Sequence, residues 1–282
     1  MNTTETIAAY FKRKLTGYYP DDEIKAVSRL IMEEVYGVSL VDLFSDKNTI
    51  LSDTQIQKLD DIIIRLQHKE PVQYILGRTV FYGMPFQVNR YVLIPRPETE
   101  ELVEWVIKES DEETKSILDI GTGSGCIAVV LAKKLPETYV EAWDFSMDAL
   151  KMARENASRN NATVHFSQQN VLQDIAATLS FDVIVSNPPY VTESEKNDME
   201  STVLDFEPHL ALFVPDDNAL LFYERIADLA MQILKPHGKM YFEINREKGQ
   251  EIVEMLAHKG FINIELRKDI SGNDRMIRAQ KE

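Results

Sequence analysis

The chain has 282 residues, a net charge of -15 and 44% hydrophobic residues, values typical of a soluble globular protein with room for one large and one small domain. No apolar run approaches the roughly 20 residues that cross a bilayer, and residues 1–10 lack the pattern of a secretory signal, so we expect a cytoplasmic protein with no membrane partner. The negative charge argues against binding that depends on neutralising phosphates, and we expect no direct nucleic-acid partner.

The chain shows no pattern of metal ligands or disulfides. Its five histidines have no ligand spacing, and a single cysteine excludes an internal disulfide. Cys126 stands between a glycine-rich segment and an apolar run, where a small packed residue is expected rather than a nucleophile. We therefore expect no metal site.

Residues 1–70 are predicted to form a small helical bundle. Apolar side chains recur at helical spacing in three groups: Ile7, Tyr10, Phe11 and Leu15; Ile24, Val27, Leu30, Ile31 and Val35; and Ile56, Leu59, Ile62, Ile63 and Leu66. Ser52 and Gln55 have the spacing of a capping box before the third group. Short amphipathic helices bury their apolar faces against each other, so the pattern favours a bundle, with a lid over a larger domain as the alternative.

Residues 71–92 are predicted to link this bundle to the rest of the chain through a β-hairpin. Residues 79–82 and 85–88 are β-prone runs, and Gly83-Met84 between them is the expected turn.

Residues 93–282 are predicted to form an α/β domain. Runs typical of strands lie at 117–120, 139–143, 164–167, 181–186, 239–244, 262–266 and 276–279. Helical segments lie at 128–135, 147–158, 220–234 and 249–258, and a further helix begins within LIPRPETE at 93–100 and carries Leu102, Val103, Val106 and Ile107. Gly272-Asn273 is a turn between the last two strands. This alternation predicts a doubly wound parallel sheet with helices on both faces.

A glycine-rich segment, DIGTGSG at 119–125, lies between a predicted strand and a predicted helix. Glycines permit positive φ angles and close approach of a ligand to the backbone, and open α/β sheets bind ligands outside the carboxyl ends of their strands. The segment lacks the Lys-Ser/Thr of a phosphate-binding P-loop. Because a tight strand-to-helix turn also needs glycine, the segment alone is a weak indication of a ligand.

Asp144 strengthens the prediction of a bound nucleoside. It ends the next predicted strand, about 20 residues after the glycines, where a carboxylate can accept hydrogen bonds from both ribose hydroxyls. The alternative is a helix-capping role before Met147, which Ser146 can fill instead. These residues leave open whether the nucleoside belongs to NAD or to S-adenosylmethionine.

The apolar run at 181–186 ends in Asn187-Pro188-Pro189-Tyr190. The prolines stiffen the loop while their carbonyls remain acceptors, and the asparagine adds a side-chain oxygen. The Asn187 oxygen and the Pro188 carbonyl would form a pair of acceptors for the two hydrogens of an NH2 group. Tyr190 would form an aromatic wall for the substrate and face a sulfonium cation. The alternative, a loop that merely starts with Asn-Pro-Pro, does not explain why it follows a strand beside the glycine-rich segment.

This arrangement suits methylation of nitrogen. The lone pair of an amide or aryl NH2 is delocalised, so the group is a poor nucleophile. Hydrogen bonds accepted from both hydrogens place electron density on the nitrogen, and alignment with a sulfonium methyl supplies much of the rate. We therefore predict a methyltransferase that uses S-adenosylmethionine and releases S-adenosylhomocysteine.

These motifs resemble those of class I S-adenosylmethionine-dependent methyltransferases that modify exocyclic nitrogens. Further motifs resemble the release factor glutamine methyltransferase family (PrmC, also called HemK): PVQYILG at 71–77, Phe81-Tyr82-Gly83, LIPRPETE at 93–100, FEPHLAL at 206–212 and KDISGNDR at 268–275. The resemblance covers nearly the whole chain.

The resemblance implies a fold and a reaction. It implies a seven-stranded Rossmann-like methyltransferase sheet in residues 93–282, a connecting β-hairpin in 71–92, and a helical domain in 1–70 that helps recruit the partner. The partner would be a bacterial class 1 peptide chain release factor, methylated at N5 of the glutamine in its Gly-Gly-Gln motif. We expect the enzyme to be a monomer.

The resemblance also implies roles for individual residues. The methionine part of S-adenosylmethionine would be bound by Gly121, Thr122, Gly123, Ser124 and Gly125, and the ribose by Asp144. Asn187 would contact both cofactor and substrate, and Pro188, Pro189 and Tyr190 would complete the substrate pocket, with catalytic roles for Asn187, Pro188 and Tyr190. Asn170 and Val171 stand where the family often has an acid and a large residue near the adenine.

Two further features concern the surroundings of this site. Glu243-Ile244-Asn245 stands where the family has Glu-Ile-Gly, which predicts an altered loop without lost chemistry. The segment after NPPY has one basic residue, Lys196, and six acidic residues: Glu193, Glu195, Asp198, Glu200, Asp205 and Glu207. These acids predict a rim that repels a phosphate backbone and suits a basic, RNA-binding protein, with a solvated loop as the alternative.

Three other functions compete with this prediction. A DNA adenine-N6 or ribosomal RNA guanine-N2 methyltransferase would use the same NPPY site, but it needs a basic groove and, for duplex DNA, a means of extruding the base. The chain has no long basic segment. A cofactor-binding module without activity is disfavoured by the intact NPPY, and an NAD oxidoreductase leaves NPPY unexplained.

Overall fold

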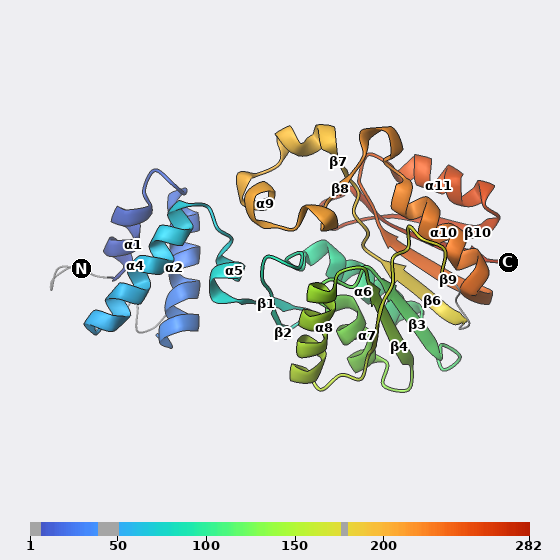
Figure 1. Cartoon of the computed structure of the whole chain (residues 1–282), viewed down its shortest axis with the longest axis horizontal. Helices are drawn as coiled ribbons and strands as arrows, with labels where there is room; N and C mark the ends of the chain where they lie inside the picture. The colour runs from blue at the N-terminus through green and yellow to red at the C-terminus, as the bar shows by residue number, and fades with distance from the viewer. Residues whose placement is uncertain (1–6, 39–50, 176–179) are drawn as a thin grey trace. The chain divides into compact units, whose positions relative to one another are not determined.

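The computed structural model describes residues 7–38, 51–175 and 180–282, which belong to two units (Figure 1). One unit comprises Met1–Gly77 with Glu200–Phe206, and the other Arg78–Met199 with Glu207–Glu282. The parts of the predicted bundle at 1–6 and 39–50 lie outside the described residues. The segment 71–92 contributes a short helix to the first unit and a hairpin to the second.

The first unit is helical, as predicted. Its helices are α1 (Ile7–Leu15), α2 (Asp21–Tyr36), α4 (Asp53–Gln67), α5 (Val72–Leu76) and α9 (Ser201–Phe206). Phe11, Ile31 and Leu59, from three different helices, are fully buried in one apolar core, as helices of this length require for stability. Ser52 and Gln55 form the expected capping box: the Gln55 N–H donates to Ser52 Oγ at 3.3 Å and the Ser52 N–H to Gln55 Oε1 at 2.9 Å.

The predicted hairpin is present, but its turn lies one residue earlier than expected. Strands β1 (Arg78–Phe81) and β2 (Met84–Gln87) pair Phe81 with Met84, so Tyr82-Gly83 is the two-residue turn. Both turn residues have positive φ, 52° and 72°, as hairpins of this length require. The left-handed conformation of Tyr82 is supported by its backbone N–H, which donates to Glu100 Oε1 at 2.8 Å.

A seven-stranded sheet forms the centre of the second unit, with the strand order β10-β11-β9-β6-β3-β4-β5. Its strands are β3 (Ser116–Ile120), β4 (Tyr139–Asp144), β5 (His165–Gln168), β6 (Phe181–Ser186), β9 (Leu234–Glu243), β10 (Phe261–Lys268) and β11 (Asp274–Lys281). The predicted parallel sheet is confirmed with one exception, since β11 runs antiparallel to both of its neighbours. Strand β9 already begins at Leu234, earlier than the predicted run at 239–244.

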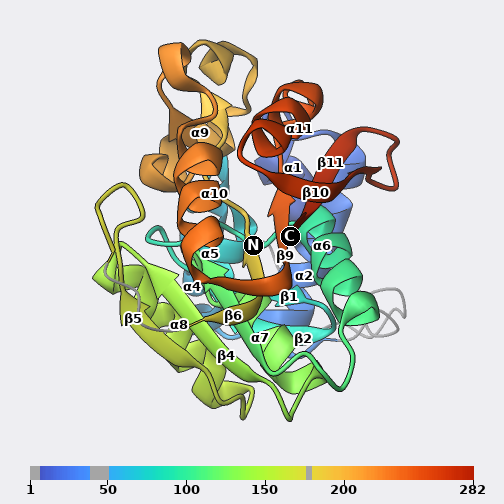
Figure 2. The same ribbon diagram turned by 90° about the vertical axis from the view of Figure 1, so that its right-hand side faces the viewer.

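Helices cover both faces of this sheet (Figure 2). α6 (Pro97–Glu109), α7 (Cys126–Lys134) and α8 (Met147–Arg159) pack on one face, and α10 (Leu221–Ile233) and α11 (Gly249–His258) on the other. Neighbouring strand residues such as Ile117 and Leu118 belong to opposite cores, because successive side chains of a strand point to opposite faces. Both faces are therefore buried, which explains the nearly continuous apolar runs of the central strands.

Short elements complete the part of the chain that follows NPPY. They are β7 (Val191–Thr192), β8 (Phe213–Val214) and the 3-10 helices η1 (Glu193–Asp198), η2 (His209–Ala211) and η3 (Asp216–Asn218). Throughout the described ranges, no helix has both the length and the apolar character needed to span a membrane.

Candidate active site

Three of the predicted site segments follow neighbouring strands at the carboxyl edge of the sheet. In the sheet register Ile120 of β3 lies opposite Ser186 of β6 on one side and Trp143 of β4 on the other. The glycine loop, NPPY and Asp144 therefore begin side by side, although they are far apart in sequence. The chain moves outward from β3 through β4 to β5 and then returns to β6, so β3 and β6 flank the topological switch point where ligands of such sheets bind.

The three glycines of the loop differ in their surroundings. All have positive φ, 75° at Gly121, 54° at Gly123 and 81° at Gly125, a region that other residues rarely adopt. A Cβ atom on Gly121 or Gly123 would meet nothing within 4 Å, so these two leave an open backbone surface. A Cβ on Gly125 would lie 2.9 Å from Ala153 Cβ, so this glycine lets α7 pack closely against α8.

Asp144 is anchored beside this loop. Its Oδ2 accepts a hydrogen bond from the Gly123 N–H and its Oδ1 one from the Ser146 N–H, each at 2.8 Å. Ser146 itself caps α8 through its Oγ, which accepts from the Ala149 N–H at 3.2 Å, so the capping alternative for Asp144 is filled by Ser146. A carboxylate has about four lone-pair sites, so Asp144 can accept from a further donor. Burial raises the pKa of Asp144.

Three further residues follow β4 and β5 at this edge of the sheet. Phe145, which the sequence analysis did not single out, directly follows Asp144 and is 55% exposed, unusual for a phenylalanine. Asn170 follows β5, and its Oδ1 accepts from the Leu172 N–H at 3.0 Å. Val171 packs against the core on the α10 side of the sheet. The side-chain oxygen of Asn170 thus shapes its own turn.

Asp119 is a buried carboxylate directly before the glycine loop. Its Oδ2 accepts a hydrogen bond from Thr122 Oγ1 at 2.6 Å, whereas no donor among the described residues meets hydrogen-bond geometry at Oδ1. Burial raises its pKa to about 7, although Thr122 and the backbone N–H of Ala128 favour the ionised form. A buried carboxylate oxygen without a donor suits a cationic ligand group such as an α-ammonium.

The four NPPY residues lie after β6 in the expected place. Pro188 is buried, and Asn187, Pro189 and Tyr190 are half-buried. Asn187 Nδ2 donates to Thr99 Oγ1 at 3.2 Å, and Tyr190 Oη donates to Glu243 Oε1 at 3.1 Å. Burial raises the pKa of Tyr190 far above its usual range, so the phenol is neutral.

Within the described residues, the two predicted acceptors of NPPY have no donor. No donor among the described residues bonds to Asn187 Oδ1 or to the Pro188 carbonyl. The site therefore combines an open glycine backbone, two carboxylates and a pair of available acceptors at the carboxyl edge of the sheet.

Thr99 and Glu243 were missed as site residues, although both lie in motifs that the sequence analysis quoted. Thr99, in LIPRPETE, is 3% exposed in the first turn of α6. Its Oγ1 donates to Glu243 Oε2 at 2.6 Å, and Glu243 is 1% exposed at the end of β9. The only indication in the sequence was that each is a polar residue near the end of a predicted helix or strand.

A second contact connects LIPRPETE with the FEP motif. Glu207 accepts hydrogen bonds from the Ile94 N–H at 3.2 Å and from Arg96 Nη2 at 2.6 Å. The glutamate is 4% exposed, so removing either partner would leave a buried polar group without its hydrogen-bond partner. This contact holds the segment that leads into α6 and Thr99.

Asn245, where the family has glycine, joins β9 to the NPPY loop. Its Nδ2 donates to the Tyr190 carbonyl at 3.2 Å and to Glu195 Oε1 at 3.1 Å. Glu195 also accepts from the Thr192 N–H at 2.7 Å. Asn245 thus anchors the loop that follows NPPY.

The predicted acidic rim divides into structural and exposed residues. Glu195 and Glu207 have the internal partners just described, whereas Glu193, Glu200 and Asp205 are exposed. The side chain of Asp198 lies outside what the structure describes.

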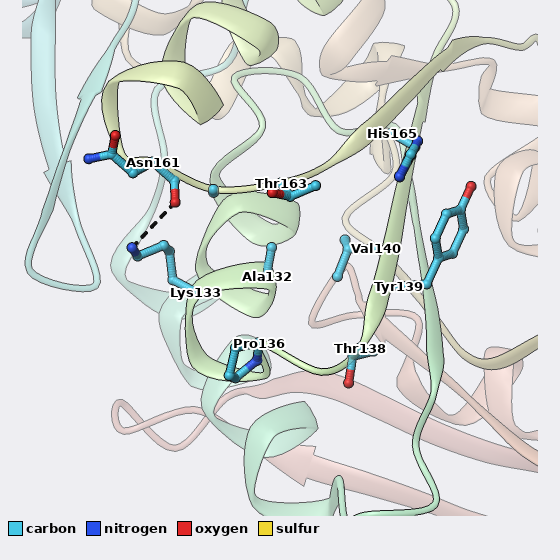
Figure 3. A pocket seen from close by; sticks show the side chains of 10 residues that line it. Ala132, Lys133, Pro136, Thr138, Tyr139, Val140, Asn161, Thr163 and His165 are labelled. Atoms are coloured by element: carbon cyan, nitrogen blue, oxygen red, sulfur yellow. Dashed lines mark hydrogen bonds between the residues drawn. The ribbon is translucent and has the colours of Figure 1, made fainter.

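A cavity of about 390 Å³ lies at the opposite edge of the sheet (Figure 3). It is lined by residues at the starts of β4 and β5 and by the end of α7. The rings of Tyr139 and His165 stack there, with 4.7 Å between their centroids. The glycine loop and NPPY follow the carboxyl ends of β3 and β6, at the other end of the sheet, so this cavity is separate from the candidate active site.

Comparison with known proteins identifies the family. The family model described as "Methyltransferase small domain" matches residues 98–205, and the one described as "PrmC N-terminal domain" matches residues 7–77. A release factor glutamine methyltransferase from Bacteroides thetaiotaomicron is 48% identical over 276 residues, covering 98% of this chain and 99% of that protein. This chain belongs to the release factor glutamine methyltransferase family. The corresponding protein of Flavobacterium psychrophilum is 47% identical over 273 residues, covering 95% and 96% of the two chains.

Solved structures agree with this family at the level of the fold. A methyltransferase from Pyrococcus furiosus matches with a TM-score of 0.53 and 19% identity, covering 82% of this chain and 99% of that one. A Thermus thermophilus 16S rRNA N2 methyltransferase matches with a TM-score of 0.51 and 16% identity, covering 73% and 50%.

Membership of this family decides between the alternatives that the motifs left open. The chain is an enzyme, a methyltransferase, and its cofactor is S-adenosylmethionine rather than NAD. The geometry fits this cofactor. The open backbone of the glycine loop leaves room for its methionine part, Asp119 Oδ1 can accept from a cationic group, and Asp144 can accept from hydroxyls.

Proposed function

We propose that this chain transfers the methyl group of S-adenosylmethionine to N5 of the glutamine in the Gly-Gly-Gln motif of bacterial class 1 peptide chain release factors. One observation carries the proposal: Asn187 Oδ1 and the Pro188 carbonyl, an unused pair of acceptors, lie beside the glycine loop. A primary amide presents two hydrogens to such a pair. The relatives at 47–48% identity bear names that specify this class of substrate.

The carboxyl edge of the sheet would hold the cofactor. Gly121, Thr122, Gly123, Ser124 and Gly125 would bind its methionine part, Asp119 its ammonium group and Asp144 its ribose. The exposed ring of Phe145 would pack on the adenine, with Asn170 and Val171 nearby. When bound, S-adenosylmethionine supplies a methyl group made electrophilic by the sulfonium charge.

The NPPY residues would make the substrate amide reactive. Asn187 Oδ1 and the Pro188 carbonyl accept from the two amide hydrogens, which turns the nitrogen toward the methyl group and raises its electron density. The Tyr190 ring forms a wall of the pocket, and Pro189 stiffens the loop. The bound cofactor would supply the methyl carbon for the new nitrogen–carbon bond, and its sulfur would keep the electron pair of the broken carbon–sulfur bond. The methylated amide then loses a proton to water, because a protonated amide is strongly acidic.

The N-terminal unit would supply part of the affinity for the release factor. We assign this role to the helical domain of residues 1–70, joined through 71–92 to the catalytic domain of 93–282. The match of residues 7–77 to a separate family model supports a distinct recognition module. The enzyme would act as a monomer in the bacterial cytoplasm, where release factors are present.

A methyl-transfer assay tests the substrate. Labelled S-adenosylmethionine is incubated with purified release factor, and in parallel with a release factor whose Gly-Gly-Gln glutamine is replaced. We expect label on the unmodified factor alone. Label on DNA or ribosomal RNA instead, with none on the factor, would keep the chemistry at Asn187 and overturn the protein substrate.

A further inference from the structure

One buried carboxylate is linked to both ends of the NPPY motif, directly to Tyr190 and through Thr99 to Asn187. In the register of β6 with β9, Ser186 lies opposite Phe242, so Asn187 and Glu243 follow at the same level of the sheet. Glu243 accepts a hydrogen bond from Tyr190 Oη at one oxygen, at 3.1 Å, and from Thr99 Oγ1 at the other, at 2.6 Å.

Thr99 extends this contact to Asn187. Its Oγ1 lies 3.2 Å from Asn187 Nδ2, so a chain of hydrogen bonds runs from Glu243 through Thr99 to the asparagine amide. Glu243 and Thr99 are 1% and 3% exposed, so water does not compete for these bonds. The three residues come from β9, α6 and the loop after β6.

Counting hydrogens along this chain fixes the direction of every bond. An ionised carboxylate only accepts, so Glu243 takes the single hydroxyl hydrogen of Thr99. The oxygen of Thr99 then has only lone pairs to offer to Asn187. The amide must therefore turn its NH2 toward Thr99, which leaves Oδ1 on the opposite side as an acceptor. An amide turned the other way would present its NH2 to the NH2 of the substrate, and the two would repel.

Neighbouring groups stabilise the negative charge of Glu243 and so favour its ionised state. Burial raises its pKa, whereas the hydrogen bond from Thr99 and the positive charge of Arg275 favour ionisation. Arg275 is held in place by Asp269, with 3.2 Å between Nε and Oδ2, and it donates to the Ile244 carbonyl at 3.4 Å. The negative charge of Glu98 opposes ionisation of Glu243.

We propose that Glu243 and Thr99 are positioning residues that set the amide of Asn187 with its oxygen toward the substrate, while Glu243 also fixes the Tyr190 ring. Neither residue needs to touch substrate or cofactor. The proposal rests on the proposed use of Asn187 Oδ1 as a substrate acceptor, and it adds the reason why that oxygen faces outward.

The matched variants Thr99→Val and Thr99→Ser test the role of the hydroxyl. Valine keeps the shape and removes the oxygen, whereas serine keeps the oxygen. We expect Thr99→Val to lower kcat about tenfold or more, the effect of losing roughly 1.4 kcal/mol of transition-state positioning, and Thr99→Ser to restore it to within about threefold. The dissociation constant for S-adenosylmethionine should stay within about twofold in both. If the valine variant does not fold, Thr99→Ala replaces it.

A purely structural role predicts a different result. Thr99→Val would then lower kcat, cofactor affinity and melting temperature together. A valine variant that turns over as fast as the wild type would overturn the positioning role while leaving the substrate assignment intact.

A second measurement does not depend on the substrate. The side-chain NH2 signals of Asn187 in an NMR spectrum, identified by their absence in Asn187→Ala, should show slowed hydrogen exchange in the wild type and in Thr99→Ser but not in Thr99→Val. Slow exchange that persists without the hydroxyl would sink the proposal. If the wild type transfers no methyl group to release factor but these signals behave as expected, the proposed function fails and the positioning role stands.

Discussion

The carboxylate of Asp144 accepts a hydrogen bond from the backbone N–H of Gly123, with 2.8 Å between the two atoms. This bond ties the end of β4 to the glycine loop that follows β3, so the residue assigned to the ribose also holds the loop assigned to the methionine part of the cofactor. The two halves of the cofactor site therefore depend on each other.

Replacing Asp144 should weaken cofactor binding more than it slows the reaction. Asp144→Ala removes both ribose contacts and the anchor of Gly123. Charge-assisted hydrogen bonds contribute about 1.5–3 kcal/mol each, so we expect the loss of two to lower affinity for S-adenosylmethionine roughly 10²-fold or more. Calorimetry measures this. Asp148→Ala, a change at an exposed aspartate in the next helix, is the matched control and should bind normally. Unaltered binding by Asp144→Ala would refute the ribose assignment.

Replacing Asn187 should slow the reaction more than it weakens cofactor binding. Asn187→Ala removes a substrate acceptor that acts in the transition state, so we expect kcat to fall roughly 10²-fold or more, as for loss of one polarising group in other active sites. Asn187 is half-buried, so the fold and the melting temperature should change little. The exposed Asn197 provides the control, since Asn197→Ala should keep normal turnover. Full activity of Asn187→Ala would exclude the NPPY mechanism.

Periodic patterns were sufficient to predict most of the fold. The alternation that predicted the sheet follows from its two buried faces, shown by Ile117 and Leu118 in opposite cores. The capping box at Ser52 and Gln55 is a local contact, so the sequence alone specifies it. The hairpin turn was misplaced by one residue because Tyr82 adopts a positive φ, which its contact with Glu100 stabilises from outside the hairpin.

The supporting residues of the site could not be predicted, because their contacts join distant parts of the chain. Thr99 and Glu243 are 144 residues apart in sequence and meet only once β9 lies beside β6. Asn156 is a similar case: it sits fully buried on the apolar face of α8. Its amide bonds to the backbone of Gln87, at 2.7 and 3.0 Å, and to the Ser124 carbonyl at 2.8 Å. A polar residue on an apolar helix face was the only indication in the sequence.

Asp119 should make the protein less stable as the pH rises. Burial raises the pKa of this carboxyl to about 7 in the folded state, well above its usual value of 3.8. A group whose folded-state pKa is raised contributes stability below its unfolded pKa and loses it as the pH rises through the folded pKa. Asp119→Asn cannot ionise, so it should gain stability over the wild type between about pH 4 and pH 7. Urea unfolding at pH 5 and pH 8 measures the difference, and an equal difference at both values would contradict the prediction.

Glu109 should have the opposite dependence on pH. It lies at the end of α6 and accepts hydrogen bonds from Arg278 Nη1 at 2.6 Å, Trp105 Nε1 at 2.7 Å, Tyr241 Oη at 2.8 Å and Lys239 Nζ at 3.2 Å. Burial raises its pKa, but these four donors outweigh that effect and lower the pKa to about 2. The ionised carboxylate thus joins α6 to β9 and β11 on one face of the sheet.

Glu109→Gln should therefore destabilise the protein at neutral pH and matter less in acid. A carboxyl with a lowered folded-state pKa contributes stability above its unfolded pKa, near 4.5, and loses it as the pH falls toward the folded value of about 2. Glutamine keeps the size of the side chain and removes the charge, so the difference in unfolding free energy between wild type and variant should shrink steadily below about pH 4.5. Denaturant unfolding from pH 7 to pH 3 follows this, with Glu112→Gln, at an exposed position in the next turn of chain, as the control that should behave like the wild type. A difference that stays constant down to pH 3 would show that the packing of Glu109, rather than its charge, holds α6 on the sheet.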